Sequence, residues 1–173
     1  MQTMGICLWY DNQAEEAVNL YASLFKNLKV LNMARYDEAG AKVANRPVGS
    51  VMTVAFELDG HSFLGLNGGP HFQFNEAVSF MIHCKDQEEA DHYWYKLTAD
   101  GGQEGHCGWL KDKFGVSWQV TPRRLMELLR DPETDLAVAL SARAFVRTHA
   151  NPAQNALAPQ ATPQLRILLV ICR

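Results

Sequence analysis

The chain has 173 residues, of which 47% are hydrophobic and 20% charged, an ordinary composition for a globular protein that can bury a core. Its net charge of -3 and its scattered lysines and arginines argue against a nucleic-acid partner. The N-terminus lacks the features of a secretion signal, and no run approaches the ~18 apolar residues of a membrane span, so we expect a cytoplasmic protein with no membrane partner.

The first predicted elements are a strand and a helix. The short apolar run Ile6–Tyr10 stops at polar residues, as a buried strand does before a helix cap. Asn12 and Glu15 lie in the register of a capping box, so we expect the helix to begin there. Apolar residues then recur at helical spacing: Ala14, Ala17, Val18, Tyr21, Leu24 and Phe25.

Three strands are predicted after this helix. Residues 29–36 and 50–58 favour strands, and the Gly, Pro and Asn residues between them indicate a loop over 40–49. Asp59-Gly60 is a hairpin signal because both central positions of a type I′ turn need positive φ, so the chain should return through 61–66. The predicted order is βαβββ.

The same order begins again after residues 67–70. A strand at 78–83 and a cap at Asp86 lead into a helix that Gly101-Gly102 closes. The inward face of this helix is predicted to hold Ala90, Tyr93, Trp94 and Leu97. Short strands should follow around 103–107, 109–112 and 116–120.

The repetition extends to individual residues. Glu15-Glu16-Ala17 aligns with Glu88-Glu89-Ala90, and Gly60–Phe63 aligns with Gly115–Trp118. This pattern predicts an internal duplication, the alternative being chance similarity of two amphipathic helices. We therefore expect one domain over 1–130 made of two modules, about 4–67 and 77–121.

The C-terminal region differs from the modules. A short helix is predicted over Arg123–Arg130, and residues 131–173 are predicted to form a second helix as far as about Arg147 and then a flexible tail. The tail ends in an apolar run, 167–172, for which the sequence suggests no function.

Three segments carry a resemblance to a known family: Cys7–Asp11, Asn67–Ala77 and Gly108–Val120. Together they resemble the PhnB-like (3-demethylubiquinone-9 3-methyltransferase-like) group of the vicinal oxygen chelate, or glyoxalase and bleomycin-resistance, superfamily. The resemblance covers about residues 4–130, whereas the tail after about Ala144 departs from the lysine-rich helical ending of this group.

The resemblance implies an α+β fold, in which the paired modules form a cup-shaped mixed sheet with helices on its outer face. The concave face of the cup would hold a small molecule, and a homodimer is expected. Members of the superfamily are metal-dependent lyases, isomerases, dioxygenases and thiol transferases, or metal-free drug-binding proteins. Fold alone does not choose among these activities.

The metal positions implied by the resemblance argue for a metal-free cup. Carried through the internal repeat, they fall near Ile6, Leu64, Ser79 and Gln119, and none of these is a His, Asp or Glu. The alternative is a metal pair from the nearby residues His61, His71, Glu76 and His83. The cysteines Cys7, Cys84, Cys107 and Cys172 form no Cys-x-x-Cys and should be reduced, so no zinc ribbon is predicted.

Strand alternation predicts which residues line the cup. Tyr10 should share a face with Ile6 and Leu8, and Met81 and His83 a face with Ser79. An apolar lining with sparse polar groups is typical of an organic-ligand pocket, although the same side chains could simply fill a core. The expected ligand-binding residues are Tyr10, Phe74, Ser79, Met81, His83, Trp109 and Gln119.

A general acid or base in the loop between the modules would have to be His71 or Glu76. The alternative is that Asn75 and Glu76 only cap backbone groups. No nucleophile motif, phosphate loop or dinucleotide cradle is present, which weakens the methyltransferase reading.

The expected function is binding of a small apolar or aromatic molecule without a cofactor, with sequestration or an undetermined conversion as the outcome. The alternatives are a metal-dependent lyase or dioxygenase, and a methyltransferase acting on a quinone.

Overall fold

The computed structural model describes residues 4–106 and 108–123. The chain divides after Phe74 into two compact units, which are considered separately. The helices predicted over 123–147 and the tail beyond them lie outside the described residues, apart from Arg123. No helix among the described residues is long and apolar enough to cross a membrane.

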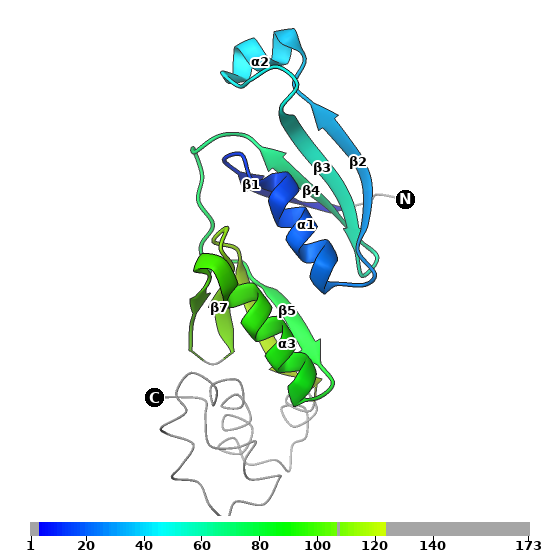
Figure 1. Ribbon diagram of the computed structural model, residues 1–173, viewed down its shortest axis with the longest axis vertical. Coiled ribbons are helices and arrows are strands. Elements are labelled where there is room, and N and C mark those ends of the chain that lie inside the picture. The colour runs from blue at the N-terminus through cyan, green and yellow to red at the C-terminus, as the bar shows by residue number, and fades with distance from the viewer. Residues whose placement is uncertain (1–3, 107, 124–173) are drawn as a thin grey trace, which may run out of the picture. The chain divides into compact units, whose positions relative to one another are not determined.

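The first unit is a four-stranded mixed sheet with a long helix on one face (Figure 1). The strand order is β1-β4-β3-β2, with β1 parallel to β4 and the other pairs antiparallel. Its elements are β1 (Gly5–Tyr10), α1 (Ala14–Leu24), β2 (Lys29–Arg35), α2 (Glu38–Ala44), β3 (Val51–Leu58) and β4 (His61–Asn67).

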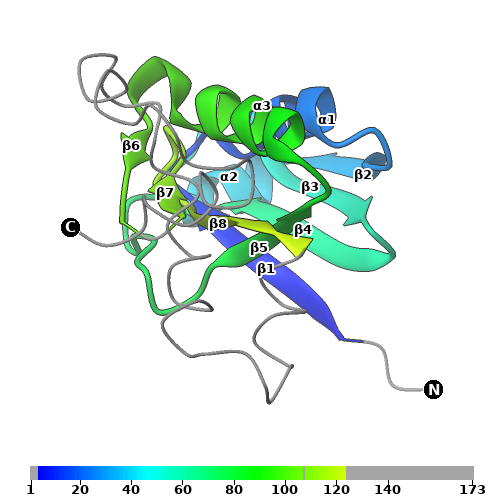
Figure 2. The ribbon, with the colours of Figure 1, turned by 90° about the horizontal axis from the view of Figure 1, so that it is seen from below.

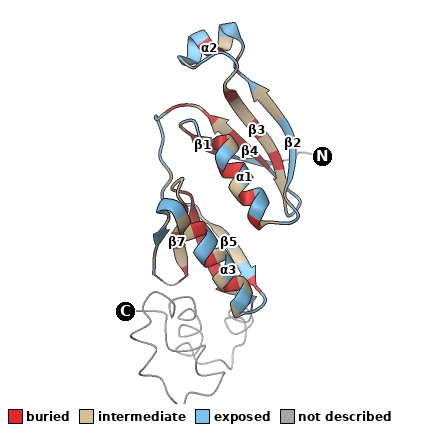
Figure 3. Ribbon diagram, in the orientation of Figure 1, coloured by how far each residue is buried: buried red, intermediate tan, exposed pale blue. Residues whose placement is uncertain are grey.

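The core of this unit lies between α1 and the sheet, where Figure 3 shows the buried positions of the helix. The helix buries Ala17, Val18, Tyr21 and Leu24, at the spacing that predicted it. Across from them the sheet buries Val54 and Phe56. The predicted hairpin turn is present, with φ of 52° at Asp59 and 75° at Gly60.

The predicted capping box at the start of α1 is wrong. The helix begins at Ala14, and its N-cap residue, Gln13, makes no side-chain cap hydrogen bond. Instead the backbone N–H of Ala14 donates to Oδ1 of Asn67, at 2.8 Å, from the end of β4. The cap therefore comes from a residue remote in the sequence, which a local pattern does not reveal.

The connection between β2 and β3 also differs from the prediction. It contains α2, at the end of the β2–β3 hairpin, where only a loop was expected over 40–49 (Figure 1). Asp37 caps this helix by accepting from the N–H of Gly40, and Asn45 ends it in the left-handed conformation. Seven residues with one buried side chain, Ala41, give too weak a periodic signal to predict a helix.

The second unit repeats this topology. Its strand order is β5-β8-β7-β6, with β5 parallel to β8 and the other pairs antiparallel, and α3 lies on one face of the sheet (Figure 2). Its elements are β5 (Phe80–Cys84), α3 (Gln87–Thr98), a 3-10 turn at Ala99–Gly101, β6 (Gln103–Glu104), β7 (Trp109–Lys111) and β8 (Ser117–Pro122). The predicted βαβββ order is therefore confirmed in both units.

The helix of the second unit follows its sequence signals closely. Asp86 caps α3 by accepting from the N–H of Glu89 at 2.9 Å, as predicted. Ala90, Trp94 and Leu97 are buried, whereas Tyr93 is half-buried. The facing strand residues that complete this core are Cys84, Leu110, Trp118 and Val120. The preceding strand begins at Phe80 rather than at Val78, which is 71% exposed.

Candidate functional site

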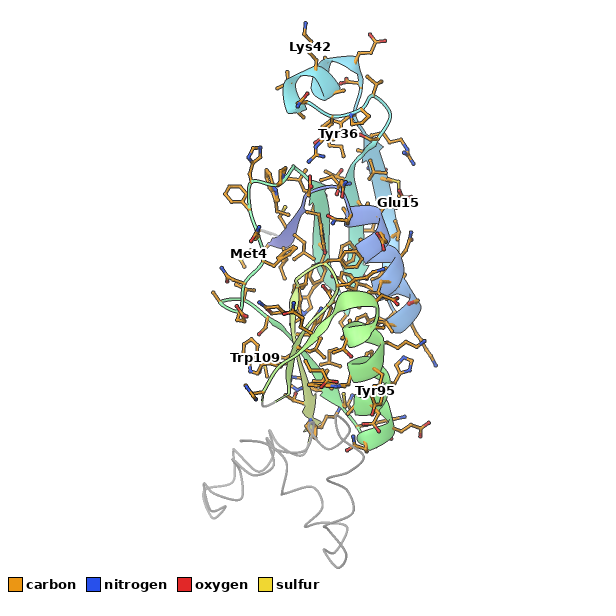
Figure 4. All side chains as sticks on the ribbon, turned by 60° about the vertical axis from the view of Figure 1, so that its left-hand side comes forward. Met4, Glu15, Tyr36, Lys42, Tyr95 and Trp109 are labelled. Carbon is orange, nitrogen blue, oxygen red and sulfur yellow. The ribbon has the colours of Figure 1, made fainter. Side chains whose placement is uncertain are left out.

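The candidate site is the face of the second sheet that lies opposite α3, called here the open face. Leu110, Trp118 and Val120 point toward α3, so by strand alternation their neighbours point to the open face. Figure 4 shows Trp109, on the open face, and Tyr95, on the outer surface of α3, on opposite sides of this unit. The open face carries Ser79, Met81, His83, Trp109, Lys111, Ser117, Gln119 and Thr121.

Three residues form a row across β5, β8 and β7. Gln119 on β8 is in register with Met81 on β5 on one side and with Trp109 on β7 on the other. Met81 is 46% exposed, and Trp109 is half-buried. Because adjacent strands lie about 4.8 Å apart, this row spans about 10 Å. It places an amide between two large apolar side chains.

Polar groups flank this row and bond to one another. Nε2 of Gln119 donates to Oγ of Ser79 at 2.8 Å. Nδ1 of His83 lies 3.2 Å from Oγ1 of Thr121, which is buried. These bonds hold the polar side chains in fixed positions on the open face, which is what orients a ligand in an otherwise apolar site.

Glu76 is tied to Lys111, a residue that the sequence analysis did not select. Nζ of Lys111 lies 2.6 Å from Oε1 of Glu76. The hydrogen bond from Lys111 holds the pKa of the Glu76 carboxyl below its ordinary value. A carboxylate with a lowered pKa is a weaker proton acceptor, so this geometry favours a charge-pairing role over that of a general base. The neighbouring Asn75 caps the backbone N–H of Ala77.

In the first unit, Tyr10 does not lie on the face that alternation was expected to give it. Tyr10 and Leu8 are buried under α1, and the hydroxyl of Tyr10 is 3.3 Å from that of Tyr21. Ile6 shares their parity, so the prediction that this face of β1 lines the cup is wrong. The opposite face of β1 instead carries Cys7 and Trp9. The run Ile6–Tyr10 is apolar on both faces and therefore gives no alternation to read.

The loop after β4 folds back onto the end of β1. Nε1 of Trp9 donates to the carbonyl of Gly69 at 2.8 Å, and its ring meets the ring of Phe72 edge-on. Phe74 likewise packs edge-on against Tyr10, with ring centroids 5.2 Å apart. His71 in this loop is exposed.

Arg46, in the connection between α2 and β3, bonds to Asp11 just after β1. Its Nη2 lies 2.7 Å from the backbone carbonyl of Asp11 and 2.6 Å from Oδ1 of the same residue. Only 18% of the Arg46 side chain is exposed, so this ion pair is better shielded from solvent than a surface pair. The sequence analysis did not select Arg46, because a single arginine in a loop carries no motif.

The structure therefore brings together part of the predicted site. Glu76, Ser79, Met81, His83, Trp109 and Gln119 all belong to the second unit, where five of them share the open face and Lys111 links the sixth to it. Tyr10, His71 and Phe74 belong to the first unit. We leave Tyr10 out of the proposed site because it is 3% exposed.

The residues at the implied metal positions do not fit a metal. Within residues 4–106 and 108–123, no group of three or more His, Cys, Asp or Glu side chains is placed to hold an ion. On β1 the residue in register with Leu64 is Cys7, rather than Ile6. The corresponding pair in the second unit is Met81 and Gln119. A thioether and an amide are poor ligands for the hard or borderline divalent ions.

Comparisons with known proteins identify the family. A family model described as 3-demethylubiquinone-9 3-methyltransferase matches residues 2–121. A comparison with curated proteins found no match. The chain is similar to the solved structure of a putative 3-demethylubiquinone-9 3-methyltransferase, PhnB protein, from Bacillus cereus, at 34% identity with a TM-score of 0.60. That match covers 70% of this chain and 99% of the other.

A second solved structure supports the fold alone. Protein PA1353 from Pseudomonas aeruginosa is 14% identical, with a TM-score of 0.51, and the match covers 69% of this chain and 96% of that one. The α+β fold predicted from the paired βαβββ modules, of the glyoxalase and bleomycin-resistance type, is confirmed. With a family model spanning residues 2–121 and a solved relative at 34% identity, the chain belongs to the PhnB-like, 3-demethylubiquinone-9 3-methyltransferase family.

Proposed function

We propose that the open face of the second sheet binds a small apolar or aromatic molecule, which the protein sequesters or converts without a bound metal. The observation that carries this proposal is the row Met81–Gln119–Trp109. Two apolar side chains about 10 Å apart, with an amide between them, match the length of a fused aromatic ring system. Ser79 and His83, which precede and follow Met81 along the chain, supply polar groups on the two sides of the row.

The exposure of the side chains on the open face supports ligand binding over the alternative, in which these side chains only fill a core. Met81 is 46% exposed and His83 is also exposed, whereas the side chains that face α3 are almost fully buried. An exposed thioether is an adaptable surface that makes favourable contacts with the aromatic ring of a ligand. Single exposed apolar residues are common, so the argument depends on their grouping with Trp109.

A thermal-shift screen of aromatic compounds, followed by calorimetric titration of each compound that stabilises the protein, tests this proposal. Met81→Arg places a charge in the row and should weaken binding at least tenfold. Tyr95→Arg is the matched control, because Tyr95 is 48% exposed on the outer surface of α3. Equal affinity of the Met81→Arg variant and the unchanged protein would show that the ligand binds elsewhere.

The family description favours a second candidate, methyl transfer to a quinone-type substrate. S-adenosylmethionine, the usual methyl donor, is commonly held at a glycine-rich turn between a strand and a helix, where backbone N–H groups are free. The turn before α1 and the turn before α3 contain no glycine, and side chains of Asn67 and Asp86 already accept from the first N–H groups. These turns do not fit such a donor. Calorimetry with S-adenosylmethionine would test the candidate directly.

A further inference from the structure

Among the residues that the structure describes, His83 is the one imidazole on the open face, and its hydrogen bonds favour one position for the ring proton. Nδ1 lies 3.2 Å from Oγ1 of Thr121 on the neighbouring strand. The same Oγ1 lies 3.2 Å from the backbone carbonyl of Ile82. Thr121 is only 6% exposed, so these contacts are shielded from solvent.

Both of these contacts can be hydrogen bonds at the same time in only one arrangement of the protons. A carbonyl oxygen only accepts, so the single hydroxyl proton of Thr121 goes to Ile82. Its Oγ1 must then accept from His83, which requires the proton of the neutral imidazole to sit on Nδ1. The lone pair is therefore on Nε2. Within residues 4–106 and 108–123, no side chain or backbone group makes a hydrogen bond with that nitrogen.

We infer that Nε2 of His83 is a fixed hydrogen-bond acceptor on the open face, and that the ligand is an aromatic molecule bearing a hydroxyl group. This inference rests on the proposed function. The ring system would lie along the row Met81–Gln119–Trp109, and its hydroxyl would donate to Nε2 at one side. A ligand that offers only acceptors there would leave the Nε2 lone pair without a partner, which costs affinity.

The first test needs no ligand. Nitrogen-15 NMR of the neutral imidazole distinguishes a protonated ring nitrogen from one that carries a lone pair. We expect the Nδ1–H form for His83 in the unchanged protein, and a loss of that preference in Thr121→Val. Thr53→Val, on the first sheet, is the matched control and should leave the signals unchanged. A predominant Nε2–H form in the unchanged protein would overturn the inference.

The second test compares 2-naphthol with 2-methoxynaphthalene, which share a ring system but differ in whether they can donate. We expect the unchanged protein to bind 2-naphthol about tenfold more tightly, a factor that corresponds to one hydrogen bond. His83→Leu should bind the two compounds equally. If the unchanged protein binds both compounds equally and Met81→Arg abolishes that binding, the inference about His83 is overturned, but the proposed site on the open face still stands. Binding of neither compound at millimolar concentration would overturn the ligand class and count against the proposed function itself.

Discussion

Asn67 makes three hydrogen bonds that connect separate elements of the first unit. Its side chain accepts from the N–H of Ala14 at 2.8 Å and donates to the carbonyl of Val51 at 3.0 Å. Its own backbone carbonyl accepts from the hydroxyl of Tyr36 at 2.8 Å. Asn67 is only 4% exposed, so water does not readily replace these partners.

Asn67→Ala should lower the free energy of unfolding by about 2–3 kcal/mol, because it leaves a buried donor and a buried acceptor without partners. Asn12→Ala is the matched control: Asn12 is exposed, and it does not cap α1 despite its place in the sequence. Urea denaturation followed by circular dichroism measures both changes. An equal loss for the two variants would mean that the cap from Asn67 does not form.

Cys84 should be much less reactive than Cys7. Burial, together with the nearby charges of Glu89 and Asp86, raises the pKa of the Cys84 thiol from 9.0 to about 12, whereas Cys7 is exposed. In a variant with Cys107 and Cys172 replaced by serine, we expect iodoacetamide at mildly alkaline pH to modify Cys7 and spare Cys84. Peptide mass spectrometry measures the two rates, and rapid modification of Cys84 in the folded protein would contradict the burial.

The same shift sets a pH dependence with a definite sign. The folded state keeps the Cys84 proton more tightly than the unfolded state, so its contribution to stability is complete below pH 9.0 and is lost as the pH rises toward about 12. Cys84→Ala should therefore reduce the loss of stability over that alkaline range. An unchanged alkaline slope in the variant would count against the raised pKa.

At the scale of elements, the two long helices begin in different ways. Asp86 caps α3 with its own side chain, and Glu89 accepts in turn from the backbone N–H of Lys85. Gln13, at the same position before α1, makes no cap hydrogen bond. A local signal is therefore sufficient for α3 but not for α1, where the sheet supplies the cap.

Asp86→Ala should cost about 1 kcal/mol of stability, the usual effect of removing an N-cap side chain. Gln13→Ala is the matched control and should cost nothing measurable. Thermal unfolding followed by circular dichroism compares the two variants. A larger loss for Gln13→Ala than for Asp86→Ala would reverse our assignment of the caps.

The sequence predicted the elements better than the faces they present. Periodicity gave both long helices, because Ala17, Tyr21 and Leu24 recur in the second unit as Ala90, Trp94 and Leu97. Strand alternation assigned Tyr10 to the wrong face of β1, because a strand with apolar residues on both faces shows no alternation. The pairing of Lys111 with Glu76 was also missed, since Glu76 lies in the loop before β5 and its contact with β7 depends on how that loop folds rather than on spacing in the sequence.

The whole molecule consists of two units of the same topology, each with its own sheet and helix. Within its unit, each sheet ends in two edge strands, β1 and β2 in the first and β5 and β6 in the second. Edge strands expose backbone groups that can pair with another chain or with another part of the same chain. The predicted homodimer would use this capacity.

We expect the protein to elute as a dimer, with a light-scattering mass of twice 19.4 kDa at micromolar concentration. A mass that stays at 19.4 kDa as the concentration is raised would contradict the proposed dimer. The same mass measurement can be made on the protein truncated after Arg123. If the truncated protein is still a dimer, the contact between subunits lies within residues 1–123.

The two repeated units differ in the length of one connection, the one that contains α2 in the first unit. Residues 36–50 join β2 to β3, whereas residues 105–108 join the corresponding strands β6 and β7. The first hairpin thus holds an additional segment without any change in strand order. Val43 on this segment is 90% exposed. The segment is therefore a natural attachment point, where a fluorescent dye or an affinity peptide could be added without altering either sheet.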